Sequence, residues 1–164
     1  MSDSAKLIAV TAGGLGLLPK APGTWGSLLP LFIVLGCGHF QCNPALIMGI
    51  LIALIIVSSV VTVGCAPWYI KHFGHNDPKQ VVSDEVAGQS IALLGMAWIT
   101  PPSESTYTWF GFALLAFVFF RLFDIWKPWI IDKSQHFKAG YGVLMDDILS
   151  GIVAGALVLL IAIY

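Results

Sequence analysis

Carboxylates stand at the ends of three apolar segments, where together they could hold a metal ion. Asp84 and Glu85 directly precede one segment, and Asp146 and Asp147 directly precede another. Asp124 lies at the end of a third. Carboxylate oxygens are the ligands that Mg²⁺ prefers, and waters with a substrate phosphate complete its coordination. The sequence therefore predicts a Mg²⁺ site built from these five acids.

Helix capping is the alternative explanation for the same acids. An acid at a helix N-terminus satisfies free backbone N–H groups and the helix dipole, which is worth roughly 0.3–1 kcal/mol. One acid per helix is enough for that purpose, but two of the three sites carry two in succession. Several carboxylates close together repel one another unless a positive charge lies between them. The doubling favours a cation.

Basic residues accompany the acids and predict contacts with a phosphate. Arg121, Asp124 and Lys127 are spaced i, i+3, i+6 along the end of one apolar segment. Arg121 and Lys127 are expected to bind the phosphate, although ion pairs with Asp124 at this helical spacing are the structural alternative. Asp84, Glu85, Asp124 and Asp147 are the expected catalytic residues, with Asp84 or Glu85 as general base.

The stretch Gly13–Ser27 is rich in Gly and Pro and reads GGLGLLPKAPGTWGS. It lacks the pattern of a P-loop, and Pro19, Pro22 and Gly23 are expected to prevent a continuous helix. Free backbone N–H groups and three polar side chains predict a phosphate-contacting loop; the side chains are those of Lys20, Thr24 and Ser27. An interfacial turn with Trp25 as an anchor among the lipid headgroups is an equally good interpretation.

Composition indicates a membrane protein. Of the 164 residues, 57% are hydrophobic and only 10% are charged, against about 25% charged in soluble domains. Mean hydropathy is +0.86. The net charge of −1 and the lack of a basic run argue against nucleic-acid binding. The length suits a single domain, residues 1–164.

Five apolar segments predict an all-α, multi-helix membrane protein, because helices satisfy their own backbone groups in lipid. The strongest, Ala45–Val63, has no charge across 19 residues, close to the roughly 20 that cross a bilayer. The other four are shorter: Ser27–Phe40, Val86–Thr100, Thr108–Phe123 and Ile148–Tyr164. Gly151 and Gly155 form a G-x-x-x-G pattern that permits close helix packing.

The charges divide unevenly between the two sides of this topology. If all five segments cross in alternation, the eight Lys and Arg residues all fall on one side. The positive-inside rule makes that side cytoplasmic. Every acid lies on the same side except Glu104. The candidate site is therefore expected at the cytoplasmic ends of the helices.

Four ordered motifs in this short chain resemble phosphatidylglycerophosphatase A. The resemblance implies a Mg²⁺-dependent lipid phosphatase that converts phosphatidylglycerophosphate to phosphatidylglycerol in the bacterial inner membrane. The motifs are LPKAPGTWGS at residues 18–27, Asp84-Glu85, FRLFDIWKPW at residues 120–129, and GVLMDDI at residues 142–148.

Other phosphate-handling classes lack their motifs here. The chain has no C-x₅-R, no D-x-D-x-[TV], and no D-G-x-x-A-R array of the CDP-alcohol phosphotransferases. No Ser, Cys or His forms a recognisable nucleophile–base pair, so direct attack by water is expected. The alternative function is a membrane phosphotransferase, or a phosphatase acting on another lipid phosphate such as phosphatidic acid.

Overall fold

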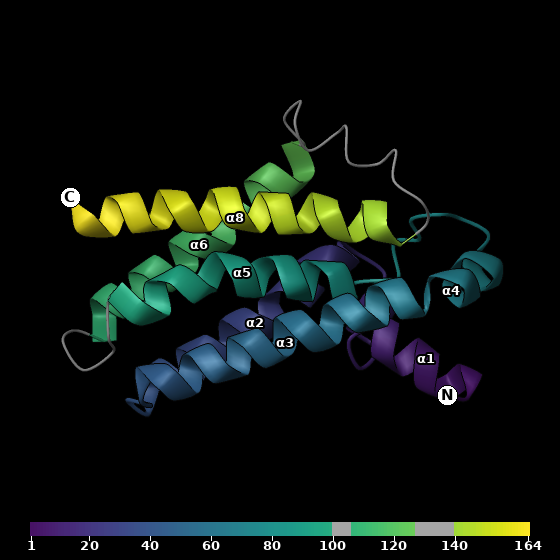
Figure 1. Ribbon diagram of the computed structural model, residues 1–164, viewed down its shortest axis with the longest axis horizontal. Helices are drawn as coiled ribbons and strands as arrows, with labels where there is room; N and C mark the ends of the chain where they lie inside the picture. The colour runs from purple at the N-terminus through teal and green to yellow at the C-terminus, as the bar shows by residue number, and fades with distance from the viewer. Residues whose placement is uncertain (100–105, 127–139) are drawn as a thin grey trace.

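The computed structural model describes residues 1–99, 106–126 and 140–164, and this part of the chain contains helices and no strand. The predicted all-α fold is confirmed, and each of the five apolar segments corresponds to a long helix (Figure 1). Two short helices and one 3₁₀ turn, η1, complete the described part. The bounds are α1 Asp3–Val10, η1 Leu15–Leu17, α2 Pro22–His39, α3 Pro44–Gly64, α4 Ala66–Phe73, α5 Ser83–Ile99, α6 Thr106–Trp126 and α8 Tyr141–Ile163.

Helix α5 is the centre of the bundle. It packs against α8 and α3 most extensively, and also against α2 and α6; Figure 1 shows it between α8 and α3. Its side chains Leu93 and Met96 are fully buried, together with Trp109 and Phe120 of α6. The polar first turn of α5 is therefore carried by a helix that is enclosed on several sides.

Within the described residues, three helices are long and apolar enough to cross a membrane, namely α3, residues 107–126 of α6, and α8. Each of them exposes large apolar side chains, for example Val60 on α3, Val118 on α6 and Leu160 on α8. Exposed apolar faces of this extent are unfavourable in water and indicate contact with lipid. The protein is a membrane protein whose outer helix faces are apolar.

The long helices run alternately between two ends of the molecule. The N-terminal ends of α5 and α8 lie at the same end as the C-terminal end of α3 (Figure 1). Gly23 near the start of α2 lies against Glu85 of α5 and Arg121 near the end of α6. The alternation assumed in counting charges is thus present in the fold, and all the candidate site residues that the structure describes lie toward one end.

Two helix starts differ from the sequence prediction by more than one helical turn. Helix α2 begins at Pro22 instead of Ser27, because proline is tolerated in the first turn, where its missing N–H would be unpaired anyway. Helix α8 begins at Tyr141 instead of Ile148, so the acids expected before the helix lie in its second turn. The hydropathy pattern predicts the start of α8 too late, because the charged pair Asp146-Asp147 interrupts the apolar segment.

The short helices α1 and α4 lie outside the five apolar segments predicted from the sequence. Each has only eight residues, too few for a clear hydrophobic period. They pack together through a small core that includes Val10, Ala66 and Tyr69. This core covers the end of the bundle at which α5 begins.

Candidate active site

Three carboxylates from two helices meet at the start of α5. Asp84, Glu85 and Asp147 each offer an oxygen, and these atoms lie within 4.8 Å of one another. Asp84 and Asp147 are only 4% exposed. Among the described residues, Asp84 Oδ1 and Glu85 Oε2 are buried and accept no hydrogen bond. An all-oxygen set of two buried carboxylates and one half-buried carboxylate, with unused acceptors, fits a hard divalent cation.

The start of α5 is held by contacts on three sides. The hydroxyls of Thr62 on α3 and Ser83 on α5 share a hydrogen bond of 2.6 Å. The backbone N–H of Val82 donates to the carbonyl of Val10 at 2.9 Å. Gly16 in η1 lies so close to the carbonyl of Gln80 that no side chain fits between them. These contacts hold the backbone at the start of α5, and so they fix the direction in which the side chains of Asp84 and Glu85 point.

Glycines bring α8 close enough to complete the group. A Cβ added to Gly151 would collide with the carbonyl of Gly88, and one on Gly88 would lie 2.5 Å from the carbonyl of Asp147. Gly155 sits against Ala92 one turn further on. The G-x-x-x-G prediction of close helix packing is confirmed, and the contact brings Asp147 next to the acids of α5.

Arg121 links Asp124 of α6 to Ser27 of α2. Its Nη1 pairs with Asp124 at 2.6 Å and lies 3.5 Å from the hydroxyl of Ser27, which donates to the carbonyl of Gly23. A Cβ on Gly23 would collide with the carboxylate of Glu85. The i, i+3 ion pair that the sequence left open is therefore present, and it stands beside the three carboxylates.

The remaining predicted residues are placed as follows. Asp146 is buried but is not part of the three-carboxylate group. Thr24 lies within α2 and is half-buried, so the expected loop is wrong from Pro22 onward. Lys20 is exposed on the turn before α2. Lys127 lies outside the described residues.

Burial raises the pKa of both acids at the start of α5. The pKa of Asp84 rises to about 6, with burial as the main cause. The pKa of Glu85 is raised well above its usual value, first by burial and then by the charges of Asp84 and Asp147. A cation among these groups would reverse the effect, because it stabilises the charged form.

The stability of the cation-free protein is expected to fall as pH rises. An acid whose pKa is higher in the folded state binds more protons when folded, so its unfavourable contribution develops between about pH 4, the ordinary value, and about pH 6. Thermal unfolding in detergent with a chelator should show the midpoint dropping by roughly 5 °C across this range. Mg²⁺ should restore the midpoint near neutral pH. Asp84→Asn should flatten the pH dependence; an unchanged pH profile in that variant would contradict the assignment.

The sequence patterns do not single out three buried polar residues that lie near the carboxylates. Gln89 and Ser150 have no hydrogen bond partner for their side chains within the described ranges, nor does the hydroxyl of Tyr69. All three are fully buried. Burial raises the pKa of Tyr69, and the nearby charge of Asp84 adds to the shift. Unsatisfied polar groups depend on tertiary packing, so no sequence pattern marks them, although Gln89 does follow Glu85 by one helical turn.

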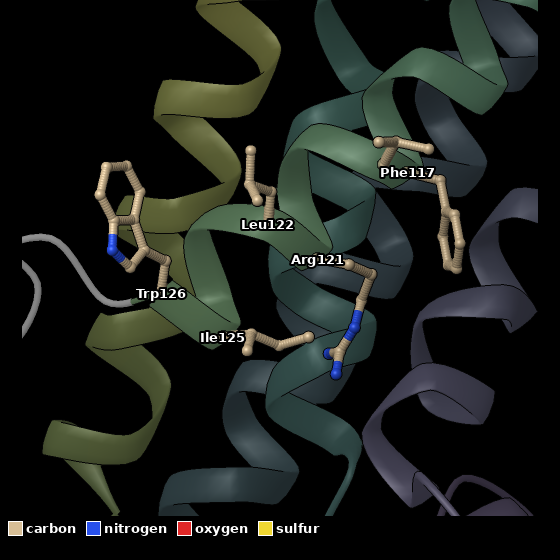
Figure 2. A pocket seen from close by; sticks show the side chains of 6 residues that line it. Phe117, Arg121, Leu122, Ile125 and Trp126 are labelled. Carbon is tan, nitrogen blue, oxygen red and sulfur yellow. The ribbon is translucent and has the colours of Figure 1, made fainter.

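An apolar groove runs along the outer face of α6. Its volume is about 770 Å³, and Figure 2 shows the side chains that line it. They are those of Phe117, Val118, Arg121, Leu122, Ile125 and Trp126. Arg121 is the only charged residue among the described residues that line the groove, and it also contacts Ser27 and Asp124 in the interior. One residue thus links the outer groove to the polar cluster.

Comparison with known proteins gives consistent results. Residues 8–162 match the family model described as phosphatidylglycerophosphatase A. The chain is 32% identical to the phosphatidylglycerophosphatase A of Escherichia coli over 96% of this chain and 83% of the relative. The identity is 34% with the phosphatidylglycerophosphatase A of Haemophilus influenzae, over 90% of this chain and 82% of the relative.

A third relative carries a different name. A Bacteroides thetaiotaomicron protein with the name of a phosphatidylinositol-3-phosphatase is 34% identical over 87% of this chain and 84% of its own length. No solved structure matches the chain. A family model that covers nearly the whole sequence, and relatives aligned along most of their length, lead to one conclusion. The chain belongs to the phosphatidylglycerophosphatase A family.

Proposed function

We propose that this lipid phosphatase hydrolyses phosphatidylglycerophosphate to phosphatidylglycerol and phosphate with the help of Mg²⁺. The observation that best supports this proposal is the group of three carboxylates beside Arg121. Arg121 also lines an apolar groove on the membrane helix α6. The names of two relatives support the substrate. Phosphatidylinositol phosphate is the second candidate substrate, because of the name of the third relative.

The side chains divide the work of hydrolysis. Asp84, Glu85 and Asp147 would hold the cation. When bound, Mg²⁺ polarises phosphoryl oxygens and lowers the pKa of a coordinated water. Arg121 offers N–H groups besides the one that Asp124 accepts, since a guanidinium carries five, and these neutralise the phosphate. Asp84 or Glu85 would take the proton of the attacking water on its second carboxylate oxygen. The water oxygen bonds to phosphorus as the bond to the lipid oxygen breaks, and the carboxyl would then return the proton to the lipid alkoxide.

Ser27 and the start of α2 supply further contacts to the phosphate. Helix α2 begins at the end of the bundle that holds the acids, and the positive end of the helix dipole there favours anions. Lys20 precedes this turn, and its exposed ammonium can add charge at the entrance. Lys127 remains a proposed phosphate ligand from the sequence pattern alone.

We place the site on the cytoplasmic side of the bacterial inner membrane. This orientation is supported by the positions of the eight Lys and Arg residues, which all belong to one side when the helices alternate. The long helices do alternate in the fold (Figure 1). A membrane-embedded phospholipid is then the substrate, with its phosphate near the helix ends and its chains along the apolar helix faces.

Phosphate release from a panel of lipids tests the substrate. The purified protein in Mg²⁺ is given phosphatidylglycerophosphate, phosphatidylinositol 3-phosphate and phosphatidic acid at equal surface concentration. We expect the highest kcat/KM for phosphatidylglycerophosphate. A higher value for the inositol lipid would transfer the assignment to the second candidate, and no release from any of the three would contradict the proposal.

The groove on α6 is proposed to hold an acyl chain of the substrate. The described residues that line it are apolar except for Arg121, the proposed phosphate ligand, so a lipid phosphate matches both parts. Leu122→Trp should fill the groove and raise KM for a long-chain substrate about tenfold, the loss of roughly two buried methylene groups. KM for a short-chain lipid phosphate should stay unchanged.

Leu114→Trp is the matched control for this variant. Leu114 is also exposed on α6, about two turns away, and does not line the groove. It should leave KM for both substrates unchanged. An equal effect of Leu122→Trp on long-chain and short-chain substrates, or no effect on either, would show that the groove holds no chain.

A further inference from the structure

Gln89 is a polar side chain that the fold encloses without satisfying. It is 0% exposed, and neither its amide oxygen nor its amide nitrogen has a hydrogen bond partner in the described part of the chain. Such a group costs free energy that an apolar side chain of similar size would avoid. The hydroxyl of Ser150 on α8 is in the same situation. Unsatisfied buried groups of this kind indicate a missing ligand or water.

The parallel packing of α5 and α8 places Gln89 and Ser150 on one flank. The contacts Gly88–Gly151 and Ala92–Gly155 advance together along both helices, so the two helices run in the same direction. Each residue turns by about 100° around a helix. Gln89 follows Gly88 on α5, and Ser150 precedes Gly151 on α8. Because the two helices are parallel and face each other, both side chains therefore turn toward the same flank of the helix contact.

The carboxylates lie on that flank as well. Glu85 and Gln89 are four residues apart and share one face of α5. Asp147 and Ser150 are three residues apart and share one face of α8. The two unsatisfied polar groups thus stand one turn further into the bundle than the acids.

We propose that Gln89, assisted by Ser150, binds the water ligands of the divalent cation held by Asp84, Glu85 and Asp147. The inference rests on the cation site of the proposed function. Mg²⁺ usually keeps several waters in proteins, and these waters need hydrogen bond partners on the inner side of the site. An amide supplies both a donor and an acceptor, and a hydroxyl does the same. Gln89 is a positioning residue in this account, acting on the cation through water.

Mn²⁺ binding by the full-length protein in detergent tests the role without relying on activity. Free Mn²⁺ is followed by electron paramagnetic resonance while the thermal midpoint is measured in chelator. Gln89→Leu keeps the size but removes both hydrogen bonding groups. We expect a Kd for Mn²⁺ raised 10- to 100-fold, as for the loss of partners that orient metal ligands. The cation-free midpoint should stay the same or rise.

Ser90→Ala is the matched control. Ser90 is adjacent and equally buried, but its hydroxyl already donates to the carbonyl of Val86 at 2.6 Å. It should leave the Kd for Mn²⁺ within twofold of the wild-type value. If Gln89→Leu does not fold, Ser150→Ala takes its place, with an expected increase in Kd of several-fold.

The outcomes separate this inference from the proposed function. Wild-type binding of Mn²⁺ by folded Gln89→Leu, or by Ser150→Ala in its place, would overturn the inference while leaving the cation site intact. A wild-type protein that hydrolyses lipid phosphate but binds no Mn²⁺ would overturn the cation site and this inference together. An equal loss of Mn²⁺ affinity in Ser90→Ala and Gln89→Leu would show that the loss comes from altered packing. That result would also overturn the inference.

Discussion

Asp147→Asn is expected to lower phosphate release by roughly a thousandfold while leaving the protein folded. The substitution keeps size and polarity but removes one of three charges that hold the cation, and metal-ion stabilisation of the reacting phosphate is worth several kcal/mol. Steady-state phosphate release at saturating Mg²⁺ measures the effect. Near-normal turnover would show that this acid is structural.

Two further variants make this result specific. Asp3→Asn removes an exposed acid at the N-terminus and should leave turnover unchanged. Asp124→Asn should also lower turnover, but it removes the partner of the partly buried Arg121. The cation-free thermal midpoint therefore distinguishes the two active-site variants: it should rise in Asp147→Asn, which relieves repulsion, and fall in Asp124→Asn, which breaks an ion pair.

Gly88→Ala is expected to have the second largest effect, on activity and on stability. The added Cβ would lie 2.5 Å from the carbonyl of Asp147 and 2.6 Å from the ring of Phe120, so α5 and α8 must separate. Overpacking of this kind costs about 1–3 kcal/mol of stability. A displacement of the carboxylates by about 1 Å is enough to lower turnover about a hundredfold.

Gly111→Ala controls for the general effect of replacing a helical glycine. Gly111 lies in α6, and a Cβ there would meet no atom within 4 Å. Stability should stay equal or rise, because alanine is the better helix former by about 1 kcal/mol. Thermal unfolding and phosphate release are measured for both variants. Equal behaviour of the two would mean that the close approach at Gly88 does not position the site.

Much of the fold could be predicted because hydropathy reports long buried or lipid-facing helices directly. Ala45–Val63 lies within α3, and the other apolar segments also correspond to long helices. Helix starts were less predictable. Proline can break a helix or occupy its first turn, and only the fold shows that Pro22 occupies the first turn of α2. The acids before Ile148 lower the local hydropathy, although α8 runs through them from Tyr141.

The site residues could be predicted where acidic residues stand side by side in the sequence. They could not be predicted where tertiary packing determines the surroundings of a side chain. The doubled acids pointed to Asp84, Glu85 and Asp147, which the fold brings together. The spacing of Arg121 and Asp124 allowed two interpretations, and only the structure shows the ion pair. Gln89 could not have been singled out, because its lack of partners follows from the approach of α8 to α5.

The central claim is that lipid phosphate hydrolysis depends on a divalent cation at the three carboxylates. Its most direct test is phosphate release from phosphatidylglycerophosphate by chelator-stripped protein during titration with Mg²⁺. The account predicts no release from the stripped protein and a saturable return of activity as Mg²⁺ is added, with Asp147→Asn failing to recover at the same concentrations. Full activity in the stripped protein, independent of added Mg²⁺, would contradict it.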